Sequence, residues 1–448
     1  MASEQDRLAQ AAKPMADAMR LHKQYRGKVQ VLPKCPVSAP SDFAIWYTPG
    51  VAAPCRAIEA DRKLVYEYTN KGNSIAGVSD GSRVLGLGNI GPEAGLPVME
   101  GKALLFKYLG GVDAVPICLK TQEPDEIVRA VEWLQPSFGG INLEDIAQPK
   151  CFRVLDALRQ SCTIPVWHDD QQGSATVLLA GLINALRVVG KDIRTARLTL
   201  VGIGAANFAT YRLLKSYGVD PAHIIACDKA GTLHGGRADI EAQQATFAEK
   251  WQVCRESNAD NLRGGIEPAL RGADICIAFS HPDPTLIKPE WVRGMARDAI
   301  VFACANPEPE IWPWLAREAG ARIVGTGRSD FPNQVNNSLA FPGIFRGVLD
   351  VRARTITDGM AIAAAEALAG ALDASALGEQ CILPGMDDWQ TAAKVAAATA
   401  MQAQAEGVAG HAMTHAEAYE RARRTIADAR AATACLMQSG SIAAKAGQ

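Results

Sequence analysis

The stretch LTLVGIGAANFATYRLLKSYGVDPAHIIACD, residues 198–228, contains two apolar runs separated by a glycine-rich turn and an amphipathic segment. This order predicts strand, turn, helix and strand, which is one βαβ unit of a parallel sheet. The turn runs from Gly202 through Gly204, Ala205 and Ala206 to Asn207, and the second run ends on Asp228. The spacing is typical of a dinucleotide-binding fingerprint. An ordinary βαβ turn without a ligand is the competing interpretation.

Several residues of this unit have an expected role in binding a dinucleotide. Gly202 permits the turn, Gly204 lets the backbone approach the pyrophosphate, and the helix N-terminus supplies N–H donors. Asn207 takes the place of the third glycine, where a larger side chain would loosen the packing of helix on strand. Asp228 would bind the ribose hydroxyls of NAD and repel the 2'-phosphate of NADP, although Lys229 would offset part of that repulsion. We therefore expect NAD; NADP is the alternative, and it would be favoured if Lys229 or a downstream basic residue such as Arg237 dominates.

Further strand-like runs follow at residues 274–279, 299–306 and 321–327, and they alternate with helical or loop segments. This pattern predicts the α/β class, with a doubly wound, Rossmann-type parallel sheet covered by helices on both faces.

The length of 448 residues allows more than one core. We predict an N-terminal α/β domain over residues 1–165 that holds substrate and metal. Residues 166–390 would form the NAD(P)-binding domain, and residues 391–448 an alanine-rich helical extension.

Two acidic pairs each follow a short apolar run. Glu144 and Asp145 stand in GGINLEDI, and Asp169 and Asp170 stand in IPVWHDDQQG. Clustered carboxylates repel one another unless a cation neutralises them, and an all-oxygen set suits Mg²⁺ or Mn²⁺. Helix caps or solvated turns explain the same charge pattern equally well.

A second glycine run, GLGNIG at residues 86–91, also fits the letters of a dinucleotide fingerprint. Lys120 stands where an acidic ribose partner would be expected, so we interpret the run as tight packing near a substrate site. Arg83 and Lys102 are the candidate polar groups there, although a lysine on an amphipathic helix is ordinarily a surface residue.

Three more candidates stand at predicted loops. Tyr47 precedes a Pro-Gly turn, where a tyrosine is usually a packing residue. Asn306 and Asn337 follow strand-like runs of the second sheet, where amide groups can orient a carboxylate or carboxamide. Simple turn formation is the competing explanation for both asparagines.

Composition excludes several classes of protein. The formal net charge is −2 without a basic tract, which argues against a nucleic-acid partner. The eleven cysteines are scattered singly, as in a reduced, cytoplasmic protein. We expect no signal peptide and no segment apolar enough to span a membrane.

Six segments, in this order, resemble the signature segments of malic enzymes of the short bacterial kind. They are YTPGVAAPC (47–55), SDGSRVLGLGNIGPEAGLPVMEGKALLF (79–106), GGINLEDI (139–146), WHDDQQGSA (167–175), FACANPEPEI (302–311) and NNSLAFPGIFRG (336–347). The resemblance covers roughly residues 20–405. It implies a cytoplasmic, oligomeric enzyme that converts malate to pyruvate and CO2 with NAD or NADP.

The resemblance also implies roles for individual residues. Mg²⁺ or Mn²⁺ would be bound by the carboxylates Glu144, Asp145 and Asp170. Lys102 would be the general base, supported by Asp169, and Tyr47 the general acid. Arg83, Asn306 and Asn337 would bind the substrate, and Asn306 would also contact the cofactor. One departure from the family pattern is Gln172, where many relatives have His.

Two other functions fit parts of the sequence. The first is a metal-dependent decarboxylating dehydrogenase of another 2-hydroxy acid, because pocket shape sets that choice. The second is a non-catalytic nucleotide-binding regulator, which would have lost a base, an acid or a metal ligand, whereas all of them are present here. The apolar faces of the terminal helices predict a homodimer or larger oligomer.

Overall fold

The computed structural model describes the backbone of residues 4–445 and the side chains of that range except residues 4–13 and 16. Its first sheet has four parallel strands in the order β2-β1-β3-β4. The strands are β1 (Ser74–Ser79), β2 (Asp113–Cys118), β3 (Gly140–Leu143) and β4 (Val166–His168). The helices among them are α5 (Pro92–Gly110), α6 (Pro124–Leu134) and α7 (Lys150–Ser161). Strands β1, β3 and β4 are buried along their whole length, as strands covered on both faces must be.

The second sheet has six strands in the order β10-β9-β8-β5-β6-β7, parallel except for β7. They are β5 (Leu198–Val201), β6 (Ile224–Asp228), β7 (Gly231–Thr232), β8 (Ile275–Ala278), β9 (Ile300–Ala303) and β10 (Ile323–Thr326). Its helices are α9 (Ala205–Ser216), α10 (Ala238–Glu241), α11 (Ala248–Glu256), α12 (Ile266–Leu270), α13 (Pro289–Arg293) and α14 (Pro313–Glu318). The predicted α/β class and the βαβ unit around Gly202 are confirmed.

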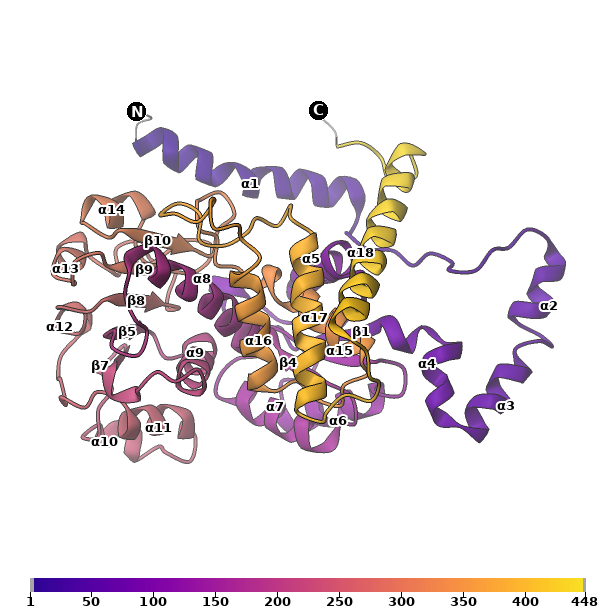
Figure 1. Cartoon of the computed structure of the whole chain (residues 1–448), viewed down its shortest axis with the longest axis horizontal. Coiled ribbons are helices and arrows are strands. Elements are labelled where there is room, and N and C mark those ends of the chain that lie inside the picture. Colours follow the sequence, from indigo (N-terminus) through magenta and orange to yellow (C-terminus); the bar gives the residue numbers. More distant parts are fainter. Residues whose placement is uncertain (1–3, 446–448) are drawn as a thin grey trace.

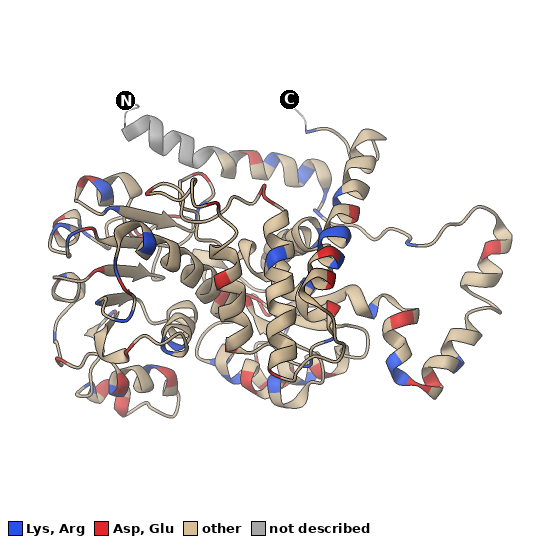
Figure 2. Ribbon diagram, viewed as in Figure 1, with Lys and Arg blue, Asp and Glu red and all other residues tan. Residues whose placement is uncertain are grey.

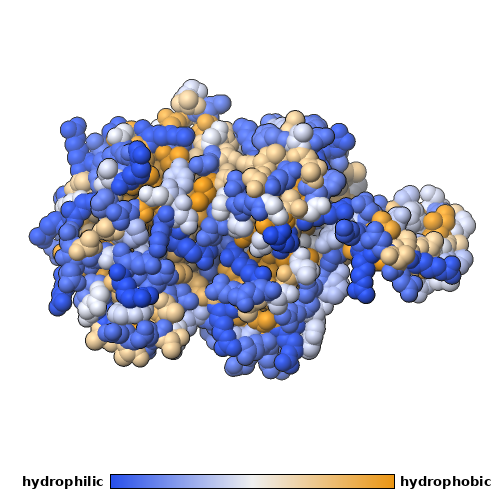
Figure 3. Space-filling view, turned by 60° about the horizontal axis from the view of Figure 1, so that its bottom comes forward, coloured by the Kyte–Doolittle hydropathy of each residue, from blue (hydrophilic) through white to orange (hydrophobic). Residues whose placement is uncertain are grey.

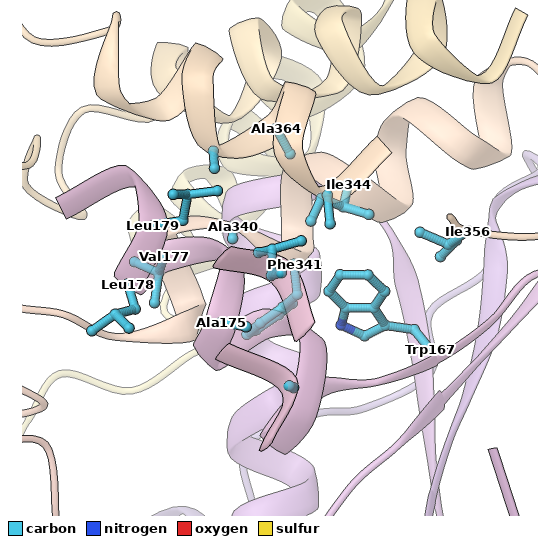
Figure 4. Close-up of a cluster of buried hydrophobic side chains, with 14 of the residues drawn as sticks. Trp167, Ala175, Val177, Leu178, Leu179, Ala340, Phe341, Ile344, Ile356 and Ala364 are labelled. Carbon is cyan, nitrogen blue, oxygen red and sulfur yellow. The ribbon is translucent and has the colours of Figure 1, made fainter. Parts of the chain in front are cut away.

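Helix α8 (Ser174–Val189) follows β4 after the short turn Asp169–Gly173 and runs between the two sheets (Figure 1). Figure 4 shows a cluster of buried side chains to which α8 contributes Ala175, Val177, Leu178 and Leu179 and to which Trp167 and Phe341 also belong. Residues 169–189 are long and apolar enough to cross a membrane by length and composition alone, so the expectation of no such segment was wrong. However, 78% of that window is buried within the protein, as in the core helix of a globular domain.

The C-terminal part contains α15 (Phe341–Asp350), α16 (Asp358–Ala369), α17 (Gln390–Ala405) and α18 (His415–Gln438). Helix α17 packs on the other three, α16 packs on α8, and α18 packs on α5. A Cβ on Gly347 of α15 would lie 2.4 Å from the Ala396 carbonyl oxygen of α17, so the two backbones approach closely. The alanine-rich helices thus complete the core.

The N-terminal part is built differently. Helix α1 (Glu4–Tyr25) leads into residues 28–70, which we call the arm, with α2 (Phe43–Trp46), α3 (Ala52–Ala60) and α4 (Val65–Tyr68). No residue of the arm is buried. Figure 1 shows it extending away from the sheets, and in Figure 3 it is a separate lobe with hydrophobic patches. Charges of both signs are intermixed on the rest of the molecule (Figure 2), which fits the small net charge.

Candidate active site

A cavity of about 900 Å³ lies where loops following strands of both sheets meet helix α5. Ligands of such sheets bind at the carboxyl ends of the strands. Among the residues that line the cavity are ten predicted site residues: Arg83, Lys102, Glu144, Asp145, Asp170, Gly204, Ala205, Ala206, Asn306 and Asn337. Groups that are far apart in the sequence therefore share one space.

Three carboxylates gather in this cavity. One oxygen from each of Glu144, Asp145 and Asp170 lies within 4.8 Å of the other two. Burial first and neighbouring carboxylates next raise the pKa of Asp145 to about 8, and burial also raises the pKa of Glu144 and of Asp170. Asp145 Oδ2 is buried without a hydrogen-bond partner. An all-oxygen set with a free, buried acceptor fits a hard divalent cation, which would remove the mutual repulsion.

Lys102 of α5 reaches the same carboxylates. Its Nζ lies 2.6 Å from Asp169 Oδ2, 3.0 Å from Glu144 Oε1 and 4.6 Å from the centre of the Phe341 ring. Burial would lower the pKa of Lys102, but the charges of Asp169 and Glu144 outweigh it and raise the pKa. The prediction that Asp169 supports the lysine is consistent with this geometry, and the surface-lysine alternative is wrong.

Asp169 is fixed from two more sides. Trp167 Nε1 donates to its Oδ1 at 3.0 Å, and the side chain has no exposed surface. Residues Asp169–Gly173 form a π-helical turn at the start of α8, a distortion that is frequent at functional sites. A Cβ on Gly173 would lie 1.9 Å from Asp169 Oδ1, so only glycine leaves room for this carboxylate.

The glycine turn after β5 has the predicted shape. Gly202 has a positive φ of 81°, Gly204 precedes α9, and both Ala205 and Ala206 face the cavity at the helix start. The expectation that Asn207 loosens the packing is wrong. Its buried Nδ2 donates to the carbonyl oxygens of Gly202, Val201 and Ile277, at 2.7, 3.1 and 3.3 Å.

Asp228 ends β6 beside this turn, but it is not free. Its Oδ1 accepts from Arg237 Nη1 at 3.1 Å and from the Ala230 N–H at 2.9 Å, and its Oδ2 accepts from Arg237 Nη2 at 3.0 Å. Asp228 and Lys229 lie outside the lining of the cavity. The expected hydrogen bonds to a ribose would therefore compete with a bidentate ion pair.

The substrate candidates lie around the same cavity. The Arg83 N–H donates to the Asp145 carbonyl at 2.9 Å, which places the arginine beside the three clustered carboxylates. A Cβ on Gly86 would lie 2.5 Å from the Asn306 carbonyl oxygen, so GLGNIG is a site of close packing, as predicted. Asn337 Oδ1 lies 3.4 Å from Lys102 Nζ.

Tyr47 lies apart from the other two predicted catalytic residues, Lys102 and Asp169. It belongs to the arm, is 71% exposed, and does not line the cavity. Its backbone bonds stay within the arm, to Phe43 and Val51. Within this single chain, the predicted acid and the predicted base are apart.

Sequence reasoning missed a buried acid that shapes the cavity wall. Glu310 is fully buried, and its carboxylate accepts from the N–H groups of Ser280 at 2.7 Å and Ala305 at 3.1 Å, both of which line the cavity. Burial raises its pKa to about 7. In the sequence, Glu310 is one of two acids in the segment NPEPEI, and no local feature distinguishes it from Glu308. Other lining residues that the sequence did not single out are Lys28, Gln148 and Ser174.

Gln172, the other departure, is also a buried structural residue. Its Oε1 accepts from the His168 N–H at 3.2 Å, and its backbone carbonyl accepts from Thr176. It does not line the cavity, so the substitution changes the support of the turn and leaves the cavity wall as it is.

Comparison with known proteins agrees with this geometry. Residues 26–159 match the malic enzyme N-terminal domain, and residues 171–312 and 321–404 match the malic enzyme NAD-binding domain. A bifunctional malic/malolactic enzyme of Bacillus subtilis is 47% identical over 91% of this chain and 97% of its own length. An NAD-dependent malic enzyme of Geobacillus stearothermophilus is 47% identical over 86% of this chain and 78% of its own. The crystal structure of Entamoeba histolytica malic enzyme superimposes with a TM-score of 0.95 at 46% identity, covering 99% of this chain and 92% of that one. The chain belongs to the malic enzyme family.

Proposed function

We propose that this protein converts L-malate to pyruvate and CO2 while reducing NAD or NADP, with Mg²⁺ or Mn²⁺ as a required cation. The observation that carries the proposal is that Lys102, which is ion-paired with Asp169, lines one cavity together with three carboxylates and the glycine turn. A base, a metal site and a cofactor turn are what oxidation of a 2-hydroxy acid needs.

The chain's own groups would move the protons. Lys102 takes the proton of the C2 hydroxyl as hydride leaves C2, and Asp169 and Asn337 hold its ammonium in place. A cation held by Glu144, Asp145 and Asp170 would polarise the C2 oxygen, and a bound nicotinamide would accept the hydride. The cation would also offset the negative charge of the carboxylates, which otherwise keeps the proton on Lys102. Loss of CO2 leaves enolpyruvate, to which Tyr47 donates a proton at C3.

Arg83, Asn306 and Asn337 would orient the substrate. Arg83 can bind a carboxylate with two parallel hydrogen bonds, and the two amides offer further donors in the same cavity. The choice of malate over tartrate or isocitrate follows from how these groups fill the cavity.

The test is an absorbance assay for reduced nicotinamide with malate and Mn²⁺ and with NAD or NADP. Tartrate and isocitrate serve as competing substrates. Turnover confined to either of them, or none with malate, would overturn the assignment. Binding of the cofactor without any turnover would favour the regulator.

We further propose that the protein is a homodimer in which the arm carries Tyr47 into the cavity of the partner. Ten of the twenty-one large hydrophobic side chains exposed among the described residues lie in the arm, including Phe43, Ile45 and Trp46. A helical segment without buried residues gains its stability from a partner surface. A second copy of this chain is the partner that would also bring the acid to the base.

The cavity mouth offers a receiving surface. Leu85, Leu87 and Ile90 are exposed before α5, and Leu96 and Leu104 are exposed on it; Leu85 and Leu104 also line the cavity. An arm docked there would bury both apolar surfaces at once, and Tyr47 would arrive beside Lys102.

Mixing two inactive variants tests the exchange. In a randomly reassembled mixture of Tyr47→Phe and Lys102→Ala chains, about a quarter of parental activity returns, because each mixed dimer contains one intact site. If Tyr47 served its own chain, every site would lack one group and no activity would return.

The matched control mixes the parent with the double variant Tyr47→Phe/Lys102→Ala. Exchange of arms leaves every mixed dimer without an intact site, so activity falls to about half of the value for the same chains unmixed. Without exchange, reassembly leaves the activity unchanged. Light scattering on the parent must show a dimer or a larger oligomer.

The domain boundaries at residues 165 and 390 stay predictions. Cytoplasmic location also stays a proposal, and what supports it is that the described residues contain no disulfide among the eleven cysteines.

A further inference from the structure

Glu310 lies behind the cavity wall and joins two loops of that wall. Its Oε1 accepts a hydrogen bond from the Ser280 N–H at 2.7 Å, in the loop after β8, and its Oε2 accepts from the Ala305 N–H at 3.1 Å, in the loop after β9. The two loops follow neighbouring parallel strands. The Ile287 N–H also donates to the Glu310 carbonyl at 3.0 Å, which ties the main chain of Glu310 to the β8 loop. One buried carboxylate therefore sets the distance between the two loops.

The β8 loop lies directly behind the glycine turn. A Cβ on Gly202 would lie 2.8 Å from the Phe279 carbonyl oxygen and 3.0 Å from Ser280 Cβ. The Phe279 N–H donates to the carbonyl of Val201, the residue before the turn. Because contacts this close leave no free space, the turn and Ser280 can shift only together. The hydrogen bond at Ser280 thus helps to place the turn that would bind the dinucleotide.

The β9 loop carries an amide that is proposed to orient the substrate. Asn306 follows Ala305 directly and is enclosed by two glycines. A Cβ on Gly86 would lie 2.5 Å from the Asn306 carbonyl oxygen, and a Cβ on Gly327 would lie 2.7 Å from its Nδ2. The hydrogen bond from this Nδ2 to the Cys304 carbonyl is 3.5 Å long and therefore weak. The amide is placed mainly by the backbone of its loop, which the buried carboxylate holds at Ala305.

We propose that Glu310 is a positioning residue that holds the cofactor turn and Asn306 at a fixed distance, and that it thereby couples binding of the two ligands. Hydride transfer depends on the distance between the substrate and the nicotinamide, and a misplacement of about 1 Å can cost roughly a hundredfold in rate. The inference rests on the proposed function in that a 2-hydroxy acid and a nicotinamide dinucleotide share this cavity.

Glu310→Gln is the decisive variant. It keeps the shape of the side chain but offers one acceptor oxygen instead of two, because the other oxygen becomes an NH2 group. Either the Ser280 N–H or the Ala305 N–H then faces a second donor, so one of the two loops is released.

Calorimetric titration measures the coupling without any turnover. It is done at pH 8, where a pKa of about 7 leaves Glu310 ionised. NAD, or NADP if it binds more tightly, is titrated in Mn²⁺ with and without tartronate, a 2-hydroxy dicarboxylate used as a substrate analogue. In the parent, tartronate tightens binding of the nucleotide about tenfold, a usual size for coupling between two sites. In Glu310→Gln, the nucleotide alone binds as in the parent, but tartronate tightens its binding twofold or less.

Hydride transfer gives the second measurement. A single turnover of malate in Glu310→Gln is roughly ten- to a hundredfold slower than in the parent. Deuterium at C2 of malate slows steady turnover more in the variant, because hydride transfer limits its rate more strongly. In the Asn306→Ala background, Glu310→Gln costs less than it does in the parent, because part of its effect passes through that amide.

Glu308→Gln is the matched control. Glu308 stands two residues earlier in the same segment, but its side chain is exposed. This change leaves the coupling and the rate of hydride transfer as they are in the parent.

An unchanged effect of tartronate in Glu310→Gln would overturn the proposal, as would the absence of any effect in the parent. An equal loss of nucleotide binding with and without tartronate would also overturn it, because a merely structural residue gives that result. So would an equal cost of Glu310→Gln with and without Asn306.

If Glu310→Gln does not fold, Glu310→Asp decides. It keeps both acceptor oxygens but draws them back by one methylene, and coupling equal to that of the parent overturns the proposal. A protein that shows the coupling and its loss as described but does not oxidise malate would refute the proposed function alone.

Discussion

Lys102 is surrounded by packed protein, whereas Tyr47 stands on an arm without a buried residue. The lysine is held by Asp169, which Trp167 and the space at Gly173 fix in turn. The tyrosine has no comparable support within its own chain. One member of the proposed acid–base pair is thus positioned by the fold, and the other by assembly. Because the two proton transfers are separate steps, the two regions can be disturbed independently.

The largest effect is expected in the buried region, at the metal carboxylates. Asp170→Ala removes one of three ligands and should abolish turnover and raise the Mn²⁺ requirement by orders of magnitude, while binding of NAD survives. Because the same change relieves repulsion among buried carboxylates, the metal-free variant should melt no lower than the parent. The measurements are activity against Mn²⁺ concentration, cofactor titration and melting in a chelator. An unchanged Mn²⁺ requirement would refute the ligand set.

Loss of the lysine should come next. Lys102→Ala should lower malate oxidation roughly a hundredfold or more, the usual scale for a positioned base. Lys102→Arg is the control, because it keeps the charge beside Asp169 but does not give up its proton. Activity of Lys102→Arg close to that of the parent would show that the group acts by charge alone.

On the arm, Tyr47→Phe should leave the oxidation of malate intact and should impair the protonation of enolpyruvate. Base, metal and hydride path stay intact, so a single turnover should still reduce the cofactor and form oxaloacetate, while steady formation of pyruvate falls. The deciding measurement is deuterium exchange at C3 of pyruvate. Exchange as fast as in the parent would assign the proton to water or to Lys102.

The smallest effect concerns Glu310, whose pKa burial raises to about 7. The folded protein then keeps a proton that the unfolded chain releases near pH 4.5, so stability from this group is present below that pH and is lost as pH rises to about 7. Between pH 5 and 8, the melting temperature of Glu310→Gln should fall less than that of the parent. The corresponding difference in the free energy of unfolding is no more than about 3 kcal/mol. Parallel profiles for variant and parent would contradict the shift.

The local sequence pattern predicted those parts of the fold that depend on neighbouring residues. Alternation of apolar runs and glycines located the sheets and the turn at Gly202, because neighbouring residues decide those structures. The carboxylates converge because parallel strands end at one edge. The Asp228–Arg237 pair depends on how the loop after β7 folds back, and the position of Tyr47 depends on what the arm contacts. Neither is encoded in the spacing of nearby residues.

Asn207 has a consequence for how the glycine turn meets its ligand. Because its amide joins the carbonyls of Val201, Gly202 and Ile277, the loop is pinned to the ends of β5 and β8 before any dinucleotide arrives. Binding of a ligand then carries no free-energy cost for ordering the loop. Replacing Asn207 with glycine would bring the sequence closer to the dinucleotide fingerprint, but it would remove these hydrogen bonds and make the loop more mobile.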